Sequence, residues 1–257
     1  MSLATKYTLK PALQAKFNGI IWKVVTDPAS SVIAIETRDP KNRTANFSAF
    51  NFDTGITLFK EISVQDSWNW GLDKACHGFV YLHSYLNEKT PEHKAIIAIN
   101  ESGYIAWEVY NRTLDNVSAD GLIVYNPTVQ QKRFELLNPA SGVIENNHID
   151  NPQFLSRNIY FPETTSNPSF LKRAMEKGTL VGSLYFLDHN GKECLSFHAV
   201  KDAILSLYLL IIDKGSLIHE EILEHNIQKL NPEPFYIEQD HLFCIRNNKQ
   251  EIVSYLV

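Results

Sequence analysis

The chain has 257 residues, of which 44% are hydrophobic and 21% are charged, and its formal net charge is −5. A protein of this length and composition can bury a sizeable core in one large domain or two small ones. The net negative charge argues against a surface for nucleic acid or anionic membranes, because phosphate binding requires clustered Lys and Arg. We therefore expect neither nucleic acid nor a membrane as a partner.

The cysteines and the start of the chain bear on the compartment. Cys76, Cys194 and Cys244 lie far apart in the sequence, and no C-x-x-C is present. This pattern indicates buried, inert thiols rather than a disulfide framework or a zinc site. Residues 1–16 lack the apolar core of a signal peptide, so we expect a cytoplasmic protein. The opening Met-Ser-Leu would also fit a replaced natural start, in which case an export signal would have been removed.

The clearest local element is "FNFDTGITLF" at residues 50–59. Asp53 can accept a hydrogen bond from the backbone two residues on, and Gly55 can adopt a positive φ without steric cost. Apolar residues alternate with other residues on both sides of this turn. The segment therefore predicts a β-hairpin.

Hairpins of this kind recur along the chain. Further turns are expected at Gly103, Gly142, Gly191 and Gly215, and a last hairpin turns at residues 247–248. The steps between the five glycines are 48, 39, 49 and 24 residues. Periods of about 40 to 50 residues are typical of propeller blades with four strands each. We therefore predict an all-β fold, a single β-propeller-like domain over residues 1–257 with about five four-stranded blades.

Two details of this fold are also expected. The strand-like segments at 31–38, 78–86 and 120–127 would be inner strands of the blades. Pairing the first strand, 18–25, with the last, 251–257, would close the ring and remove an exposed edge. If the periodicity is accidental, a β-sandwich or an irregular β-fold is the alternative.

Two segments carry helical signals. Residues 167–178 have a proline near the start and a glycine at the end, which predicts a short helical insert. Residues 217–230 fit either a helical face or a strand. We therefore expect one or two short helices.

The hairpin sequences resemble a known repeat. In quinoprotein-like, PQQ-type β-propellers, Asp-x-Gly is followed four residues later by Trp, and "DTGITLF" and "ESGYIAW" are similar to this pattern. The fourth residue is Phe59 after Gly55 and Trp107 after Gly103, whereas the three later copies have Asn, Leu and His. The resemblance extends over residues 20–145. The chain also resembles an uncharacterised bacterial family of propeller-like proteins without an assigned activity.

This resemblance implies a scaffold rather than a redox enzyme. The quinone enzymes of the family use a calcium-associated ligand set in the centre of a large propeller. No stretch of this sequence matches that set, and the chain is short for it. We therefore expect no cofactor.

The residues richest in possible chemistry lie at 65–85, between an outer strand and the next inner strand. We predict that Asp66, Trp68, Trp70, Asp73 and His77 bind a ligand, because aromatic faces beside carboxylate and imidazole suit a polar molecule. The alternative is structural. The two tryptophans would then pack between blades, and the polar side chains would hydrogen-bond to strand turns.

Other polar segments lack a functional pattern. "HEEILEH" at 219–225 resembles a zinc protease signature, but Leu223 stands where the second histidine should be, so we predict no metal site. The segment 145–153, with Glu145, His148 and Asp150, is expected to be a solvated loop.

No catalytic constellation is recognisable. The leading hypothesis is a non-enzymatic propeller scaffold that binds a protein segment or a small polar ligand, at the funnel or on a blade edge. The alternative is a hydrolase or lyase acting on a sugar-like substrate in the central funnel, which rests on the tryptophans and carboxylates of 65–85.

Overall fold

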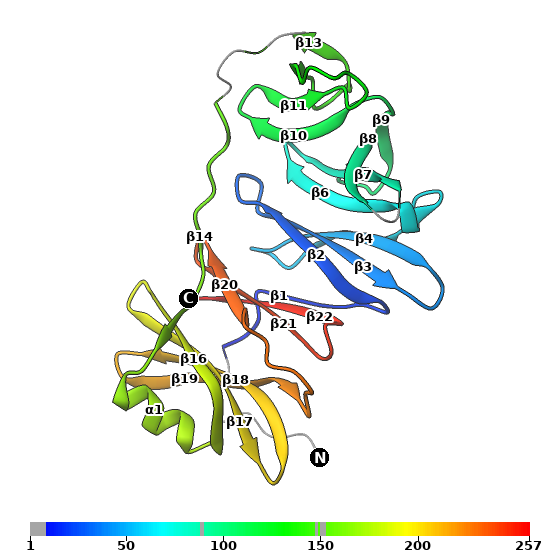
Figure 1. The fold of residues 1–257 in the computed structure, drawn as a ribbon. Helices are drawn as coiled ribbons and strands as arrows, with labels where there is room; N and C mark the ends of the chain where they lie inside the picture. Colours follow the sequence, from blue (N-terminus) through cyan, green and yellow to red (C-terminus); the bar gives the residue numbers. More distant parts are fainter. Residues whose placement is uncertain (1–8, 88–89, 147–148, 150–152) are drawn as a thin grey trace. The chain divides into compact units, whose positions relative to one another are not determined.

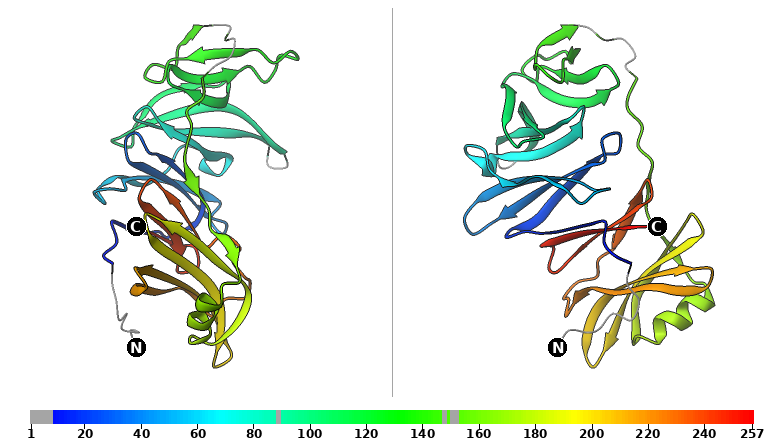
Figure 2. Two further views of the ribbon diagram at one scale, coloured as in Figure 1. Left: turned by 90° about the vertical axis from the view of Figure 1, so that its left-hand side faces the viewer. Right: turned by 180° about the vertical axis from the view of Figure 1, so that it is seen from behind.

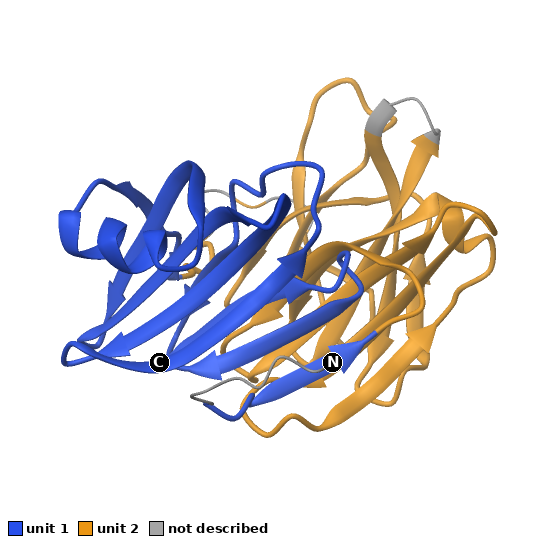
Figure 3. Ribbon diagram, turned by 90° about the horizontal axis from the view of Figure 1, so that it is seen from below, with its two compact units in different colours: residues 1–16, 158–257 blue, residues 17–157 orange. Residues whose placement is uncertain are grey.

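The protein is built almost entirely of antiparallel sheets. The computed structural model describes residues 9–87, 90–146, 149 and 153–257. The described strands form five sheets of four or five strands. The chain divides into two compact units, shown in different colours in Figure 3. We call residues 17–157 the three-sheet unit and residues 1–16 with 158–257 the two-sheet unit, and describe each by itself.

The three-sheet unit consists of three meanders in which strands pair in chain order. A short 3-10 helix, Ser67–Asn69, joins the first sheet to the second. In Figure 1 the sheets follow one another from blue through cyan to green. The strands are β2 (Ile20–Asp27), β3 (Val32–Asp39), β4 (Thr44–Asn51) and β5 (Thr57–Ile62); β6 (Trp70–Cys76), β7 (Phe79–Asn87), β8 (Thr90–Asn100) and β9 (Ile105–Val109); and β10 (Thr113–Ser118), β11 (Gly121–Tyr125), β12 (Phe134–Leu137) and β13 (Ile144–Asn146).

The two-sheet unit contains two five-stranded sheets and the one α-helix of the described residues. One sheet has the order β15-β16-β17-β18-β19, and the other has the order β1-β22-β21-β20-β14. The elements are β1 (Leu13–Lys16), β14 (Ile159–Tyr160), β15 (Glu163–Thr165), α1 (Pro168–Met175), β16 (Thr179–His189), β17 (Lys192–Lys201), β18 (Ile204–Asp213), β19 (Ser216–His225), β20 (Phe235–Glu238), β21 (His241–Arg246) and β22 (Glu251–Leu256).

These sheets confirm the predicted fold class. The chain is all-β, and its five antiparallel sheets are the blades of a propeller-type fold, with one helical insert. Two sheets have a fifth strand because the short strands β14 and β15 add to an edge. Five separate sheets, rather than two, leave no place for the β-sandwich alternative.

The topology explains the irregular spacing of the turn glycines. Gly55, Gly103, Gly142 and Gly215 all lie between the last two strands of their sheets. Gly191 lies instead between β16 and β17, in the same sheet as Gly215. The short step of 24 residues therefore connects two turns of one sheet, whereas the longer steps include a crossing to another sheet.

Turn glycines in the three-sheet unit contact an aromatic residue of the preceding sheet. A Cβ at Gly103 would lie 2.9 Å from the Cβ of Phe59, and one at Gly142 would lie 2.7 Å from Cδ2 of Trp107. The indole of Trp107 also donates a hydrogen bond of 2.8 Å to the carbonyl of Pro139. The glycine and the aromatic residue of the repeat therefore meet across consecutive sheets, and each turn packs on the sheet before it.

The prediction that residues 18–25 pair with the C-terminal strand is wrong in its N-terminal partner. The C-terminal strand β22 pairs with β1, whereas residues 18–25 lie mostly in β2, which pairs with β3. In β1 the side chains of Leu13 and Ala15 are buried, and Gln14 donates a hydrogen bond of 2.7 Å to Glu251. Two apolar residues in a four-residue strand are too weak a pattern to mark it in the sequence.

The two segments with helical signals have different structures. The helix expected at 167–178 is confirmed as α1, whose N-cap Asn167 accepts a hydrogen bond from the backbone of Ser169. The helix lies against the sheet that contains β16 and β17 (Figures 1 and 2). Its buried residues Phe170 and Ala174 belong to the hydrophobic core of that sheet. Residues 216–225 form β19, which pairs along β18, so the helical alternative for 217–230 is wrong.

The cysteines are buried and free in the described structure, as predicted. Burial raises the pKa of Cys76, Cys194 and Cys244 to about 12, which keeps each thiol protonated and unreactive at neutral pH. Within the described residues, no helix has the length and hydropathy needed to cross a bilayer. His148 and Asp150, in the expected loop at 145–153, lie outside the described residues.

Candidate functional site

A β-bulge recurs in the first strand of each sheet of the three-sheet unit. The pairing with the second strand skips Trp22 in β2, Asp73 in β6 and Asp115 in β10. A bulge leaves one residue unpaired and turns its side chain away from strict alternation, and bulges are frequent beside functional sites. In the middle sheet the bulged residue is a carboxylate, and this carboxylate is directed at two histidines.

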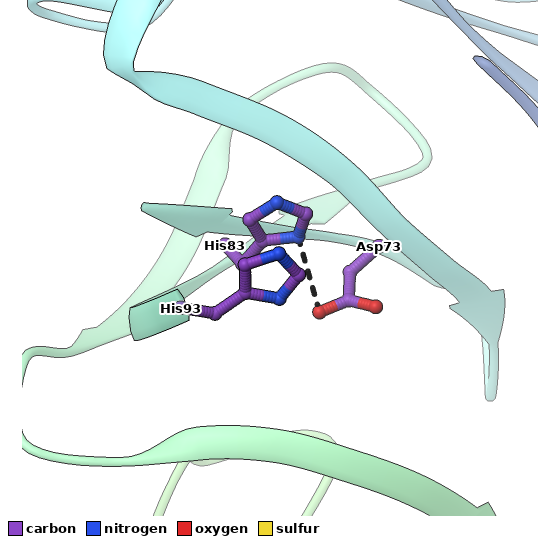
Figure 4. Close-up of side chains that lie close together, drawn as sticks. All are labelled: Asp73, His83 and His93. Atoms are coloured by element: carbon purple, nitrogen blue, oxygen red, sulfur yellow. Dashed lines mark ion pairs between the residues drawn. The ribbon is translucent and has the colours of Figure 1, made fainter. Parts of the chain in front are cut away.

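Asp73, His83 and His93 come from three adjacent strands, β6, β7 and β8. His83 Nδ1 lies 3.3 Å from Asp73 Oδ2. The two imidazole rings stack face to face, with centroids 3.4 Å apart and planes 10° from parallel (Figure 4). One potential ligand atom from each of the three side chains lies within 4.8 Å of the other two. Two nitrogens and one carboxylate oxygen are thus gathered in one small volume.

Packing, rather than hydrogen bonding, holds His83 in place. The residue is 2% exposed, and neither ring nitrogen has a hydrogen-bond partner among the described residues. Asp73 Oδ2 likewise has no hydrogen-bond partner among the described residues, and its contact with His83 Nδ1 is an ion pair of 3.3 Å. Gly71 lies opposite His83, and a Cβ there would be 2.8 Å from Nε2. The edge of Tyr85 contacts both rings, at centroid distances of 4.8 and 5.5 Å.

The electrostatics of the cluster favour an anionic carboxylate and a neutral imidazole. Burial acts to raise the pKa of Asp73, but the adjacent His83 and the charge of Lys23 outweigh it, so that the pKa lies below its usual value. Burial lowers the pKa of His93, and His83 acts in the same direction. Neutral imidazole and ionised carboxylate are the forms that ligate metal ions.

A separate pocket lies at the ends of the first strands β2, β6 and β10. Its volume is about 190 Å³. Val25, Val117 and Leu155 supply apolar surface. The polar lining consists of Thr26, Asp27, Lys74, Asn116, Ser156 and Arg157. Three sheets and the segment after β13 thus contribute to one concave surface.

The charged side chains of this pocket are one carboxylate and two cations. The carboxylate of Asp27 accepts hydrogen bonds from the backbone of Ala29 at 3.1 Å and from the hydroxyl of Ser30 at 2.6 Å. It therefore serves the turn between β2 and β3. Lys74 and Arg157 supply two positive charges, and the Arg157 guanidinium also contacts the hydroxyl of Thr26. The lining therefore favours an anionic ligand.

The pocket of the two-sheet unit has a different chemistry. It has a volume of about 280 Å³ and lies beside a bulge in β16. Its polar side chains are the hydroxyls of Thr164, Thr165, Ser166 and Ser183, together with His198. The buried His198 accepts a hydrogen bond of 3.0 Å from the backbone of Asn231. No carboxylate or permanent cation is present among its described lining residues, so it offers a ligand hydroxyl groups and one imidazole.

The five predicted ligand-binding residues are distributed over several places. Asp66 and Trp68 line a shallow surface pocket of about 360 Å³. Trp70 is buried in the hydrophobic core of the first two sheets. Asp73 lies in the cluster with the histidines. His77 is exposed at the turn after β6, and its Nε2 lies 3.0 Å from the carbonyl of Ser118. Ligand binding by these residues stays a prediction.

The structural alternative for the tryptophans has a physical basis in Arg38. Its guanidinium donates hydrogen bonds to the carbonyls of Trp68 and Trp70, at 3.1 and 2.9 Å, and lies 5.0 Å from the centroid of the Trp68 ring. Arg38 belongs to β3 of the first sheet, and Trp70 begins the second. These contacts join the two sheets.

Sequence reasoning did not identify His93, Lys74 or Arg157. His83 lay within the segment 65–85, but nothing in the sequence paired it with His93. The two histidines meet because β7 and β8 are adjacent and Tyr85 is opposite His93. A prediction of strand register, including the bulge at Asp73, would have been needed to bring the three side chains together.

One family model matches part of the chain. The family described as "Domain of unknown function (DUF4905)" matches residues 26–107, a range that contains Asp73, His83 and His93 but less than half of the chain. Comparison of the sequence with curated proteins gives no significant match.

Two solved structures resemble the chain at low similarity. A "Bifunctional GH43-CE" protein of Bacteroides eggerthii is 11% identical, with a TM-score of 0.28, and the match covers 99% of this chain and 34% of that one. This chain therefore spans about a third of the length of that protein. A structure described as the "Dos1 propeller" is 12% identical, with a TM-score of 0.31, and the match covers 97% and 76% of the two chains. The fold assignment rests on the sheets themselves.

Proposed function

We propose that the protein is a non-enzymatic binding scaffold, whose pocket at the ends of β2, β6 and β10 takes a small ligand bearing a carboxylate. The observation that carries this proposal is the presence of Lys74 and Arg157 around a concave surface whose carboxylate, Asp27, is already hydrogen-bonded within its own turn. Arg is suited to bidentate recognition of a carboxylate, and Lys adds a point charge.

The size of the pocket restricts the ligand. A volume of about 190 Å³ is below the usual range of about 300 to 1,000 Å³ for sites of drug-sized molecules. It suits a dicarboxylate of a few carbon atoms or one acidic side chain of a protein segment. Val25, Val117 and Leu155 would contact the hydrocarbon part of such a ligand, and the cations would bind its charged end.

Hydrolysis of a sugar-like substrate is less well supported in this pocket. Glycosidases commonly use two carboxyl groups, about 5 to 5.5 Å apart in retaining enzymes and about 6.5 to 9.5 Å apart in inverting ones. Among the described lining residues there is one carboxylate, Asp27, and both of its oxygens accept hydrogen bonds. Binding without turnover is therefore the better proposal.

The proposal also concerns the type of repeat in the scaffold and the cellular compartment of the protein. The contacts of Gly103 with Phe59 and of Gly142 with Trp107 support a quinoprotein-like repeat in the three-sheet unit, used as a scaffold only. The free, buried cysteines support a cytoplasmic location, because exported proteins more often form disulfides. The net charge of −5 supports a partner other than nucleic acid.

Titration with a charged probe and its neutral analogue tests the proposal. Succinate and succinamide have similar shapes, but only succinate carries carboxylates. In 15N-detected NMR, succinate should shift signals of Lys74, Val117 and Arg157 in a saturable way, and succinamide should shift them much less. Equal effects of the two probes, or shifts spread evenly over the surface, would contradict the proposal.

Variants in which glutamine replaces a lysine, and so removes one positive charge, make this test more specific. Lys74→Gln should weaken succinate binding by about tenfold, the loss expected when one charge-assisted hydrogen bond worth about 1.5 kcal/mol is removed. Lys41→Gln is the matched control, because Lys41 is an exposed residue of the same unit that does not line the pocket. Equal weakening by both changes would indicate a general charge effect rather than a site.

A further inference from the structure

We propose that Asp73, His83 and His93 form a binding site for a divalent transition metal ion of the zinc class. Two imidazoles and one carboxylate supply three protein ligands, and a water molecule would complete a tetrahedron. This site is independent of the proposed carboxylate pocket, because none of the three residues lines that pocket. Zinc binding and succinate binding can therefore succeed or fail separately.

The distances between the ligand atoms are close to those of a metal site. Zinc is bound at about 2.0 to 2.2 Å by histidine nitrogen and carboxylate oxygen, which places tetrahedral ligand atoms about 3.4 Å apart. His83 Nδ1 and Asp73 Oδ2 are already separated by 3.3 Å. The third ligand atom, from His93, lies within 4.8 Å of the other two. Moving the His93 nitrogen closer by up to about 1.4 Å would bring all three atoms to this spacing.

The buried polar atoms of the cluster lack hydrogen bonds. A buried polar atom without a hydrogen bond costs about 1 to 3 kcal/mol, so the interior of a protein rarely contains several together. Here His83 Nδ1, His83 Nε2 and Asp73 Oδ2 all lack a hydrogen-bond partner among the described residues. A metal ion would satisfy one of the two nitrogens and the carboxylate oxygen. This observation is independent of the distances.

The surroundings hold His83 rigidly and leave freedom to His93. Gly71 provides the space for the His83 ring, and Tyr85 lies beside both stacked rings, nearly perpendicular to their planes. His93 is only half-buried. An ion midway between two parallel rings would lie outside both ring planes, so coordination requires one ring to turn. The geometry indicates that His93 turns, about a χ2 angle whose energy profile is broad.

Lys23 opposes cation binding. Its charge acts on both Asp73 and His93 from the neighbouring strand β2. The net charge of the carboxylate and this lysine is zero, which disfavours hard cations that depend on accumulated negative charge. Imidazole ligands instead suit zinc, copper, nickel and iron. The same argument gives a diagnostic variant: replacing Lys23 by a neutral residue should tighten binding.

Competition with a chromophoric chelator measures binding in untagged, full-length protein. We expect one Zn²⁺ per chain that is not displaced by millimolar Mg²⁺ or Ca²⁺, and a Co²⁺ adduct with the visible absorption of a four-coordinate site. Asp73→Asn and His93→Gln should each weaken Zn²⁺ binding by at least about tenfold, the low end of losses measured for outer-shell changes at metal sites. Lys23→Gln should strengthen it several-fold.

His189→Ala is the matched control. His189 lies 3.2 Å from Asp240 and so forms a histidine–carboxylate pair without a second histidine ligand among the described residues. This change should leave Zn²⁺ affinity unaltered. If Zn²⁺ binds with less than one ion per chain, or if Asp73→Asn, His93→Gln and His189→Ala bind equally well, the proposal is overturned.

A measurement on the unaltered protein covers the case in which a variant fails to fold. In long-range 1H–15N spectra of the histidine rings, stoichiometric Zn²⁺ should shift the nitrogens of two of the nine histidines. Contacts with Tyr85 identify these rings as His83 and His93. Shifts at other histidines, or no shifts at one equivalent of Zn²⁺, would refute the site without any substitution.

Discussion

The three-sheet unit and the two-sheet unit are built from the same antiparallel meander but differ at the turns. In the three-sheet unit, Gly103 and Gly142 sit against Phe59 and Trp107 of the preceding sheet. In the two-sheet unit, a Cβ built on the turn glycines Gly191 or Gly215 would meet no described atom within 4 Å. The glycine in the repeat therefore has two roles. Everywhere it permits a positive φ, and only in the three-sheet unit does it also permit close packing between sheets.

Buried Arg–Glu pairs show a second difference between the units. In the three-sheet unit Glu36 accepts hydrogen bonds from Arg38 at 2.5 Å and from the backbone of Leu72 at 2.7 Å, which joins two sheets. In the two-sheet unit Glu251 accepts from Arg246 at 2.9 Å and from Gln14 at 2.7 Å. That network joins the N-terminal strand β1 to β21 and β22 within one sheet. The first network adds to the contact of Gly103 with Phe59 between the same two sheets, and the second joins strand β1 to strand β22.

Of the substitutions that test this comparison, Trp107→Ala should lower the free energy of unfolding most. The side chain is buried, packs on Gly142 and Tyr81, and donates a hydrogen bond to Pro139. Loss of its contacts and the resulting cavity should lower the free energy of unfolding by about 3 to 5 kcal/mol. Urea unfolding measures this difference. It should be monitored by the circular dichroism of the backbone, because the substitution removes a tryptophan.

Trp22→Ala is the control for the tryptophan prediction. Trp22 belongs to the same unit but is 65% exposed at its bulge, with the Arg38 guanidinium 5.6 Å from the centroid of its ring. Its replacement should cost no more than about 1 kcal/mol. Similar losses from both substitutions would show that packing between the sheets is not what stabilises the unit.

A pair of glycine substitutions should separate the two roles of the turn glycine. Gly142 and Gly191 have φ values of 70° and 76°, so alanine at either position costs about 1 to 2 kcal/mol in backbone strain. At Gly142 the new methyl group would also lie 2.7 Å from Trp107. That overlap should add about 1 to 3 kcal/mol. Equal free energies of unfolding for Gly142→Ala and Gly191→Ala would remove the distinction between the units.

Much of the fold could be predicted because turns and alternation are local. The hairpins at Gly55, Gly103 and Gly142 pair residues that are at most 15 positions apart in the chain. The pairing of β1 with β22 depends on two buried residues, Leu13 and Ala15, and on strands more than 230 residues apart. No local pattern specifies such a contact, and the greater number of apolar residues in β2 favours that strand over β1 as the partner of β22.

The candidate site was less predictable for the same reason. Composition drew attention to residues 65–85, and Asp73 and His83 do lie together. Whether a carboxylate in β6 reaches an imidazole in β8, however, depends on the bulge at Asp73 and on a second bulge at Ala95, where φ is 58°. A shift of one residue in register reverses the face of every side chain in a strand. Sequence alternation alone cannot place His93.

The smallest expected effect is a pH dependence that arises in the two-sheet unit. Burial lowers the pKa of His219 to about 4, and the charge of Arg246 acts in the same direction. The ordinary value is about 6.5, so the unfolded chain binds this proton first as the pH falls. Stability should therefore be full above pH 6.5, decrease as the pH falls from 6.5 towards 4, and lose no more from this group below pH 4.

Urea unfolding of the unaltered protein and of His219→Gln at pH 7 and pH 5 isolates this contribution. The stability lost by the unaltered protein between these values should exceed the loss in the variant by about 1 to 2 kcal/mol, since one proton contributes about 1.4 kcal/mol per pH unit. His77→Gln, which removes an exposed histidine of the three-sheet unit, should retain the full dependence. If the slope for His219→Gln matches that of the unaltered protein, His219 is not buried in its neutral form.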